Sequence, residues 1–90
     1  MQKETPVYVP INCSFHDVLL DRATLAQVCE LVFHWERQTR TERAIITDVF
    51  SREGAEYLQL NNGLEIRLDY LISVDDFQLA QMDACIYKRG

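Results

Sequence analysis

The sequence predicts a mainly β (α+β) fold, in which one N-terminal helix packs on a small, strongly bent antiparallel β-barrel of five or six strands. Three observations support this prediction. Residues 14–23 show a helical pattern, apolar residues alternate on both sides of residues 61–63, and short β-rich runs recur between residues 28 and 74. Barrel closure would also remove exposed sheet edges. We expect a single domain over residues 1–90.

Size and charge narrow the possible functions. The chain has 90 residues, 48% of them hydrophobic, which suffices for one small core. Nine Lys and Arg residues against fourteen Asp and Glu residues give a net charge of −5. This charge repels nucleic acid phosphates at long range and favours a basic protein partner. Because no apolar run approaches the roughly 20 residues of a membrane span and the polar start does not match a signal peptide, we expect a cytoplasmic protein.

The chain contains three cysteines, Cys13, Cys29 and Cys85. Their number is odd, their spacing is wide, and they form no zinc-type cluster with histidine. We therefore expect free thiols, mostly buried, because cysteine commonly behaves as a small apolar residue. No metal ion or other cofactor is expected.

Residues 14–23 have the pattern of an amphipathic helix. Ser14 with Asp17 three residues later is close to a capping box, which would place Asp17 in the first turn, where the helix dipole favours an acid. The apolar stripe consists of Phe15, Val18, Leu19 and Ala23. The opposite face carries His16, Asp17 and Asp21, with Leu20 at its edge.

Strands are predicted from residue 28 onwards. Residues 28–35 are rich in β-branched and aromatic side chains and predict the first strand. The polar residues 36–43 predict a turn and the start of a second strand, whose main part is residues 44–50. Residues 51–54 predict a tight link with Gly54 in the left-handed conformation.

The clearest prediction is a β-hairpin around residues 61–63. A three-residue loop places Leu60 opposite Leu64 and Leu58 opposite Ile66, whereas a two-residue turn would direct one strand's apolar residues into water. Gly63 then occupies the left-handed position of the loop. The outer face of this hairpin pairs Tyr57 with Arg67 and Gln59 with Glu65, and we expect it to be exposed.

The two ends of the chain carry weaker patterns. Residues 1–9 are expected to form an extended arm, because prolines interrupt any regular period. Residues 70–74 predict a fifth strand, and residues 76–82 fit either a short helical turn or a loop. Residues 84–87 predict a closing edge strand, and residues 88–90 are expected to fray.

No catalytic constellation stands out, so we do not expect an enzyme. Asp75 and Asp76 are adjacent carboxylates, but neighbouring side chains at a strand end point to opposite sides. His16 and His34 have no third ligand at a metal-binding spacing. These residues are more simply read as a solvated turn and as surface histidines.

One basic cluster suggests an alternative function. It consists of Trp35, Arg37, Arg40 and Arg43. An aromatic ring beside arginines is typical of single-stranded RNA binding, so an Sm-like RNA-binding module using this surface is the alternative. Glu36 and Glu42 lie within the cluster and lower its positive field, which favours a salt-bridged loop over direct nucleic acid binding.

Several short segments share a pattern that extends over residues 8–76. They are Tyr8-Val9-Pro10-Ile11-Asn12-Cys13, Asp17, Ser51-Arg52, Glu56-Tyr57-Leu58 and Arg67-Leu68-Asp69. Together they resemble the Rof (YaeO) family, the Rho-binding antiterminators of bacteria.

The resemblance implies a Rof-like domain, with an N-terminal helix on an Sm-like β-barrel. Members of this family bind the N-terminal RNA-binding domain of the transcription termination factor Rho and block its primary RNA sites. The implied function is therefore transcription antitermination by a non-enzymatic inhibitor, with Rho as the partner. A folded acidic surface can occupy a basic RNA-binding groove through charge-assisted hydrogen bonds. We expect a monomer that uses no cofactor.

The resemblance also implies where the partner binds. The predicted contact residues are His16, Asp17 and Asp21 on the helix and Ser51, Arg52, Glu53 and Gly54 in the link between two strands. The Asp17 carboxylate would pair with an arginine or lysine of Rho, and His16 would supply stacking area or a hydrogen bond. Ser14, Phe15 and Leu20 stand where well-known members carry acids.

Overall fold

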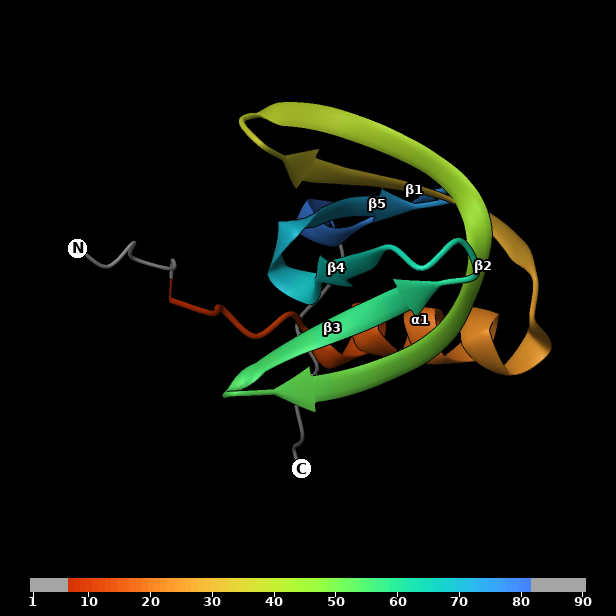
Figure 1. Ribbon diagram of the computed structural model, residues 1–90, viewed down its shortest axis with the longest axis horizontal. Helices are drawn as coiled ribbons and strands as arrows, with labels where there is room; N and C mark the ends of the chain where they lie inside the picture. The colour runs from red at the N-terminus through yellow and green to blue at the C-terminus, as the bar shows by residue number, and fades with distance from the viewer. Residues whose placement is uncertain (1–6, 82–90) are drawn as a thin grey trace.

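The computed structural model describes residues 7–81, which form one α-helix and a six-stranded antiparallel sheet (Figure 1). The elements are α1 (Cys13–Leu25), β1 (Val28–Trp35), β2 (Gln38–Arg52), β3 (Ala55–Leu60), β4 (Glu65–Arg67), β5 (Leu71–Val74) and β6 (Phe77–Gln78), with short 3-10 helices at Leu68–Tyr70 and Leu79–Gln81. The predicted mainly β (α+β) class is confirmed.

The long strand β2 holds the two halves of the sheet together. The strand order is β4-β3-β2-β1-β5-β6. The first part of β2 pairs with β1 and the second part with β3, and the β2–β3 register shifts between Ile46 and Asp48. Figure 1 shows β2 curving through the sheet so that β1 and β3 lie on different sides of the molecule. This bend wraps the sheet around a single core.

The predicted closure into a barrel is not observed, because β4 and β6 are edge strands within the part of the chain that the structure describes. β4 has three residues, and the chain then turns into the 3-10 helix Leu68–Tyr70. The N–H of Leu71 bonds to the carbonyl of Leu68 at the end of this helix. This hydrogen bond between β4 and β5 is therefore made within the connecting segment and not to another strand.

The strand predicted at residues 28–35 has the observed bounds of β1, but β2 is longer than predicted. Residues 36–43, predicted as a turn and the start of the second strand, contain a shorter turn than expected, because β1 pairs with β2 along its whole length, from Val28 opposite Ile45 to Trp35 opposite Gln38. The turn is reduced to Glu36 and Arg37, which both have positive φ angles, 50° and 69°. The two turn residues therefore adopt the left-handed conformation of a tight hairpin without a glycine.

Helix α1 begins earlier than predicted. Its N-cap is Asn12, whose Oδ1 accepts a hydrogen bond of 2.8 Å from the N–H of Phe15, so the predicted cap at Ser14 is wrong. Asp17 consequently lies beyond the first turn, which contains no acid. Ala26, at a φ of 52°, ends the helix in the left-handed conformation.

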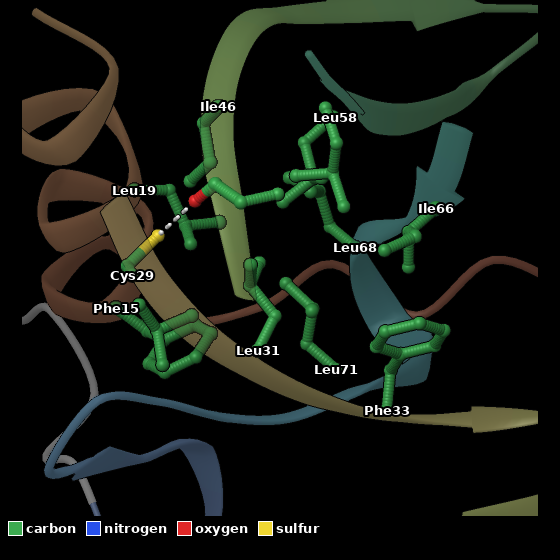
Figure 2. Packing of buried hydrophobic residues seen from close by; sticks show 13 residues of the cluster. Phe15, Leu19, Cys29, Leu31, Phe33, Ile46, Leu58, Ile66, Leu68 and Leu71 are labelled. Atoms are coloured by element: carbon green, nitrogen blue, oxygen red, sulfur yellow. Dashed lines mark hydrogen bonds between the residues drawn. The ribbon is translucent and has the colours of Figure 1, made fainter. Parts of the chain in front are cut away.

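The core lies between α1 and the concave side of the bent sheet (Figure 2). The predicted helix stripe is confirmed, because Phe15 and Leu19 are fully buried and Val18 and Ala23 pack against the same cluster. Figure 2 shows the side chains of Phe15 and Leu19 facing Leu31 of β1 and Ile46 of β2. The other buried members come from every strand from β1 to β5 and from the first 3-10 helix: Cys29, Phe33, Ala44, Leu58, Leu60, Ile66, Leu68, Leu71 and Val74.

The predicted β3–β4 hairpin register is confirmed. Leu58 lies opposite Ile66, and the N–H of Leu60 bonds to the carbonyl of Leu64 at 2.9 Å. Gly63 has a φ of 90°, as the three-residue loop requires. The alternating apolar pattern was sufficient here because every contact that sets the register is local.

The predicted exposure of the outer hairpin face is wrong at Arg67, which is 6% exposed. Its Nε and Nη2 donate to the two carboxylate oxygens of Asp69 at 2.7 and 2.8 Å. Its guanidinium carbon lies 5.6 Å from the ring centroid of Tyr8 and 4.9 Å from that of Tyr70. The N–H of Val9 also bonds to Asp69, at 3.0 Å. The N-terminal arm therefore covers this end of the sheet.

The tail between residues 76 and 81 combines a short strand and a 3-10 helix, since β6 pairs with β5 before Leu79–Gln81. Three earlier predictions lie outside the described residues: the arm before residue 7, the edge strand at residues 84–87 and the frayed end at residues 88–90. Within residues 7–81, no helix has the length and apolar character needed to cross a membrane.

The cysteines differ from one another. Cys29 is free and buried, and its thiol lies 3.5 Å from the carbonyl oxygen of Ala44 (Figure 2). Burial raises the pKa of the Cys29 thiol. Cys13 is disulfide-bonded, so the prediction of a free thiol is wrong at this position. The prediction for Cys85 lies outside the described part of the chain.

Candidate partner-binding groove

The start of helix α1 and the β2–β3 hairpin border one groove, with a volume of about 510 Å³. It lies where the N-terminal arm, the first turns of the helix and the hairpin meet. The lining residues are Tyr8, Pro10, Ile11, Cys13, His16, Ser51, Gly54, Ala55 and Glu56. His16, Ser51 and Gly54, which sequence reasoning assigned to a common surface, therefore border the same groove.

A polar side-chain contact joins the helix to the sheet at this groove. Nε2 of His16 lies 3.3 Å from Oε1 of Glu56, and both side chains are partly exposed. Glu56 pairs with Ser51 across the β2–β3 ladder, so the helix contact reaches the hairpin directly. This is the contact by which helix and hairpin present one continuous face.

Asp17 and Asp21 lie on the solvent side of α1. Each follows a fully buried residue, Phe15 or Leu19, by two positions, which is about 200° of rotation around the helix. Both acids are exposed. Asp21 is 3.8 Å from Nη1 of Arg22, a contact too exposed to hold it firmly. The two carboxylates, one helical turn apart, remain accessible to a basic partner.

The β2–β3 hairpin is a two-residue turn whose geometry follows from its sequence. Glu53 and Gly54 have φ angles of 53° and 82°, the left-handed pair that tight hairpins require. Gly54 confirms the predicted left-handed position, whereas Glu53 adopts a conformation that is uncommon for a residue with a Cβ. Both residues are exposed at the tip of the hairpin.

Arg52 is less available for contact with a partner protein than the sequence suggested. Its Nη1 lies 3.1 Å from Oε1 of Glu65, and its guanidinium lies over the rings of Phe50 and Tyr57, at 5.0 and 5.3 Å from their centroids. These two rings stack on each other with centroids 5.6 Å apart. Arg52 therefore belongs to the outer face of the sheet and does not line the groove.

Tyr8 and Glu56 are among the groove residues that sequence reasoning did not assign to the site. Burial, followed by the negative charges of Glu56 and Asp69, raises the pKa of Tyr8 to about 12, so the phenol stays neutral at physiological pH. The strand period could have identified Glu56, because it shares the inward-facing set with Leu58 and Leu60. An acid at an inward position marks a place where the core opens to solvent.

The residues of the alternative RNA-binding surface do not form one patch. Arg40 lies opposite Phe33, and Arg43 lies opposite Glu30 in the same uninterrupted register. Residues three apart on a strand face opposite sides, so Arg40 and Arg43 project from different faces of β2. Arg40 also pairs with Glu42 at 2.6 Å and lies over the ring of Trp35, 5.3 Å from its centroid.

Asp75, a remaining candidate residue, has structural contacts. It accepts hydrogen bonds from Nε of Arg22 at 2.9 Å and from the N–H of Glu30 at 3.0 Å. His34 and Asp76 are exposed. No group of three or more His, Cys, Asp or Glu side chains in residues 7–81 could hold a metal ion.

No protein-family model, curated protein or solved structure matches this chain.

Proposed function

We propose that this protein is a non-enzymatic inhibitor of the transcription termination factor Rho. It binds the N-terminal RNA-binding domain of Rho, blocks primary-site RNA binding and so causes antitermination in the bacterial cytoplasm. The proposal rests on the resemblance of residues 8–76 to the Rof family and on one observation. Helix α1 and the β2–β3 hairpin, which carry the expected contacts, border a common groove and are joined by the His16–Glu56 pair.

Charge and exposure support this proposal. The chain has a net charge of −5, and Asp17 and Asp21 face solvent on the helix beside the groove. A surface that binds RNA phosphates is basic, so an acidic surface of matching shape attracts it at long range and pairs with it on contact. Association should therefore be fast and should weaken as ionic strength rises.

The proposed architecture is Sm-like. The strand order β4-β3-β2-β1-β5, the bent β2 and the short 3-10 helix between β4 and β5 are consistent with such an arrangement. Because β4 and β6 are both edge strands in the described part of the chain, barrel closure does not support the proposed Sm-like architecture. The surface proposed to meet Rho lies at α1 and the β2–β3 hairpin and does not depend on barrel closure.

Competition between this protein and RNA for Rho tests the proposal. The purified protein should co-elute with Rho and displace single-stranded RNA from its primary sites. Asp17→Lys should weaken Rho binding about tenfold or more, because it places a cation against a basic surface. Asp48→Lys is the matched control, since it makes the same charge change at an exposed position of β2.

The outcomes distinguish the two functions. Full Rho binding by Asp17→Lys, with Asp48→Lys equally unaffected, would remove Asp17 from the interface. Absence of Rho binding by the wild-type protein would reject the proposed function. Tight binding of single-stranded RNA at low salt, lost in an Arg37→Glu, Arg40→Glu double variant, would favour the RNA-binding module instead.

A further inference from the structure

The carboxylate of Glu56 is only partly engaged. Its Oε1 faces His16 at 3.3 Å, whereas its Oε2 has no polar partner among the residues that the structure describes. A carboxylate offers about four acceptor positions, so Glu56 can bind a second donor without releasing His16. The side chain is also accessible, because its inward position on β3 lies at the border of the groove and not in the core.

The walls of the groove suit an aliphatic chain. Pro10, Ile11 and Ala55 supply apolar surface, and Tyr8 adds a phenol ring that remains neutral at physiological pH. The volume of about 510 Å³ lies within the range of roughly 300–1,000 Å³ typical of small-ligand pockets. A long side chain could therefore bury its methylene groups here and carry a polar head to the carboxylate.

The charge of the groove determines whether the polar end of a bound side chain is a cation or an anion. Glu56 is the only acid among the described lining residues, and no lysine or arginine is among them. Two exposed acids are sequence neighbours of lining residues, Asp17 of His16 and Glu53 of Gly54. The neighbouring cation, Arg52, is paired with Glu65. An anion would be repelled by these carboxylates, whereas a cation would be attracted.

We propose that this groove binds the side chain of an arginine from a partner protein, with Glu56 as the acceptor of its guanidinium. Arginine fits because its planar N–H groups pair with a carboxylate while its three methylene groups contact Pro10 and Ile11. If the proposed function is correct, as this inference assumes, the arginine belongs to the RNA-binding surface of Rho. The groove then acts as an anchor site next to the contacts made by Asp17.

The site can be tested without Rho. Titration of the isotope-labelled protein with N-acetyl-arginine amide should give saturable chemical-shift changes at His16, Ser51 and Gly54 in the millimolar range. N-acetyl-citrulline amide, which has nearly the same shape but no charge, should give at least about tenfold weaker effects. Equal shifts with both compounds, or no saturable shift with the arginine compound, would overturn the inference.

Two variants identify the acceptor. Glu56→Gln should abolish saturation by the arginine compound, whereas Asp48→Asn, an equal charge change at an exposed position of β2 outside the groove lining, should retain it. Near-identical amide spectra away from the groove would show that both variants fold. Loss of the effect in both variants equally would mean that the general acidity of the surface, and not Glu56, binds the probe.

Binding to Rho separates this inference from the proposed function. Glu56→Gln should weaken Rho binding about tenfold or more, and Asp48→Asn, at an exposed position of β2, should change it less. Undiminished Rho binding by Glu56→Gln would overturn the anchor role while the proposed function stands. Binding of the arginine compound without any binding of Rho would instead reject the proposed function and leave the site in place.

Discussion

Two pairs of polar side chains lie near Tyr8, and they differ in how much water reaches them. The Arg67–Asp69 pair has two hydrogen bonds, at 2.7 and 2.8 Å, and its side chains are 6% and 9% exposed. The His16–Glu56 pair has one contact, at 3.3 Å, and its side chains are 27% and 44% exposed. Both pairs connect to the N-terminal arm, the first through the Asp69–Val9 hydrogen bond and the second through the shared groove.

The difference separates a structural contact from an exchangeable one. Removing one partner of a buried pair leaves an uncompensated charge, so Arg67 and Asp69 cannot leave each other at low cost. An exposed pair gains little free energy, because water can replace either partner. Glu56 can therefore take a new partner from another protein, whereas Asp69 cannot.

The largest expected effect comes from breaking the buried pair. Arg67→Met should lower the free energy of unfolding by about 3–5 kcal/mol, because it leaves the Asp69 carboxylate buried without its cation. Urea denaturation followed by circular dichroism measures this change. The double variant Arg67→Met, Asp69→Leu is the control.

In that double variant the uncompensated charge is gone, so much of the lost stability should return. A single variant that is less than about 1 kcal/mol below the wild-type protein would show that the pair is better solvated than its burial indicates.

An intermediate effect is expected from pH. Burial alone would raise the pKa of Asp69, but hydrogen bonds from Arg67 and from the N–H of Val9 hold it below the ordinary value of 3.8. The Asp75 carboxyl shifts in the same direction: burial would raise its pKa, but bonds from Glu30 and Arg22 lower it. A lowered folded-state pKa stabilises the protein above the unfolded-state value, and this contribution disappears as pH falls through the folded-state pKa.

We therefore expect the free energy of unfolding to fall as the pH drops below about 4. Asp69→Asn should be less stable at neutral pH and should lose less additional stability in acid, because one of the two linked carboxyls is gone. Denaturation curves measured from pH 7 to pH 2.5 test this, with Asp48→Asn as the control at an exposed site. Parallel curves for wild-type protein and Asp69→Asn would contradict the linkage to Asp69.

The smallest effect is expected at the exposed pair. His16→Gln should change the free energy of unfolding by less than about 1 kcal/mol, since partly exposed ion pairs contribute little. The same urea titrations measure it. A loss as large as that of Arg67→Met would mean that His16 fixes the helix to the sheet, and the contrast between the two pairs would disappear.

Local patterns predicted much of the fold. The alternation around residues 61–63 fixed the register of the β3–β4 hairpin, and the β-branched run at residues 28–35 matched β1. Element ends were predicted less well. Residues 38–43 are strand because β1 pairs with them across a two-residue turn, and Asn12 caps α1 although Ser14 had the more familiar spacing.

The candidate site divides in the same way. The family resemblance implied a shared surface for His16, Ser51 and Gly54, and the structure brings these three residues to one groove. The resemblance also placed Arg52 there, and the sequence grouped Arg40 with Arg43, but Arg52 pairs with Glu65 and the other two arginines face opposite sides of β2. Charges close together in the sequence can be separated by the strand period and by neighbouring partners.

The sequence by itself determined the mainly β class, the helix stripe and the hairpin register, because each depends on the spacing of apolar residues within one element. Only the tertiary structure decided that Arg67 is buried and that Glu56 opens onto a groove. Both outcomes depend on the N-terminal arm, whose Tyr8 contacts Arg67 and borders the groove from far away in the sequence. Whether a residue is exposed depends on which other segment packs over it. The spacing of apolar residues within a strand does not identify that segment.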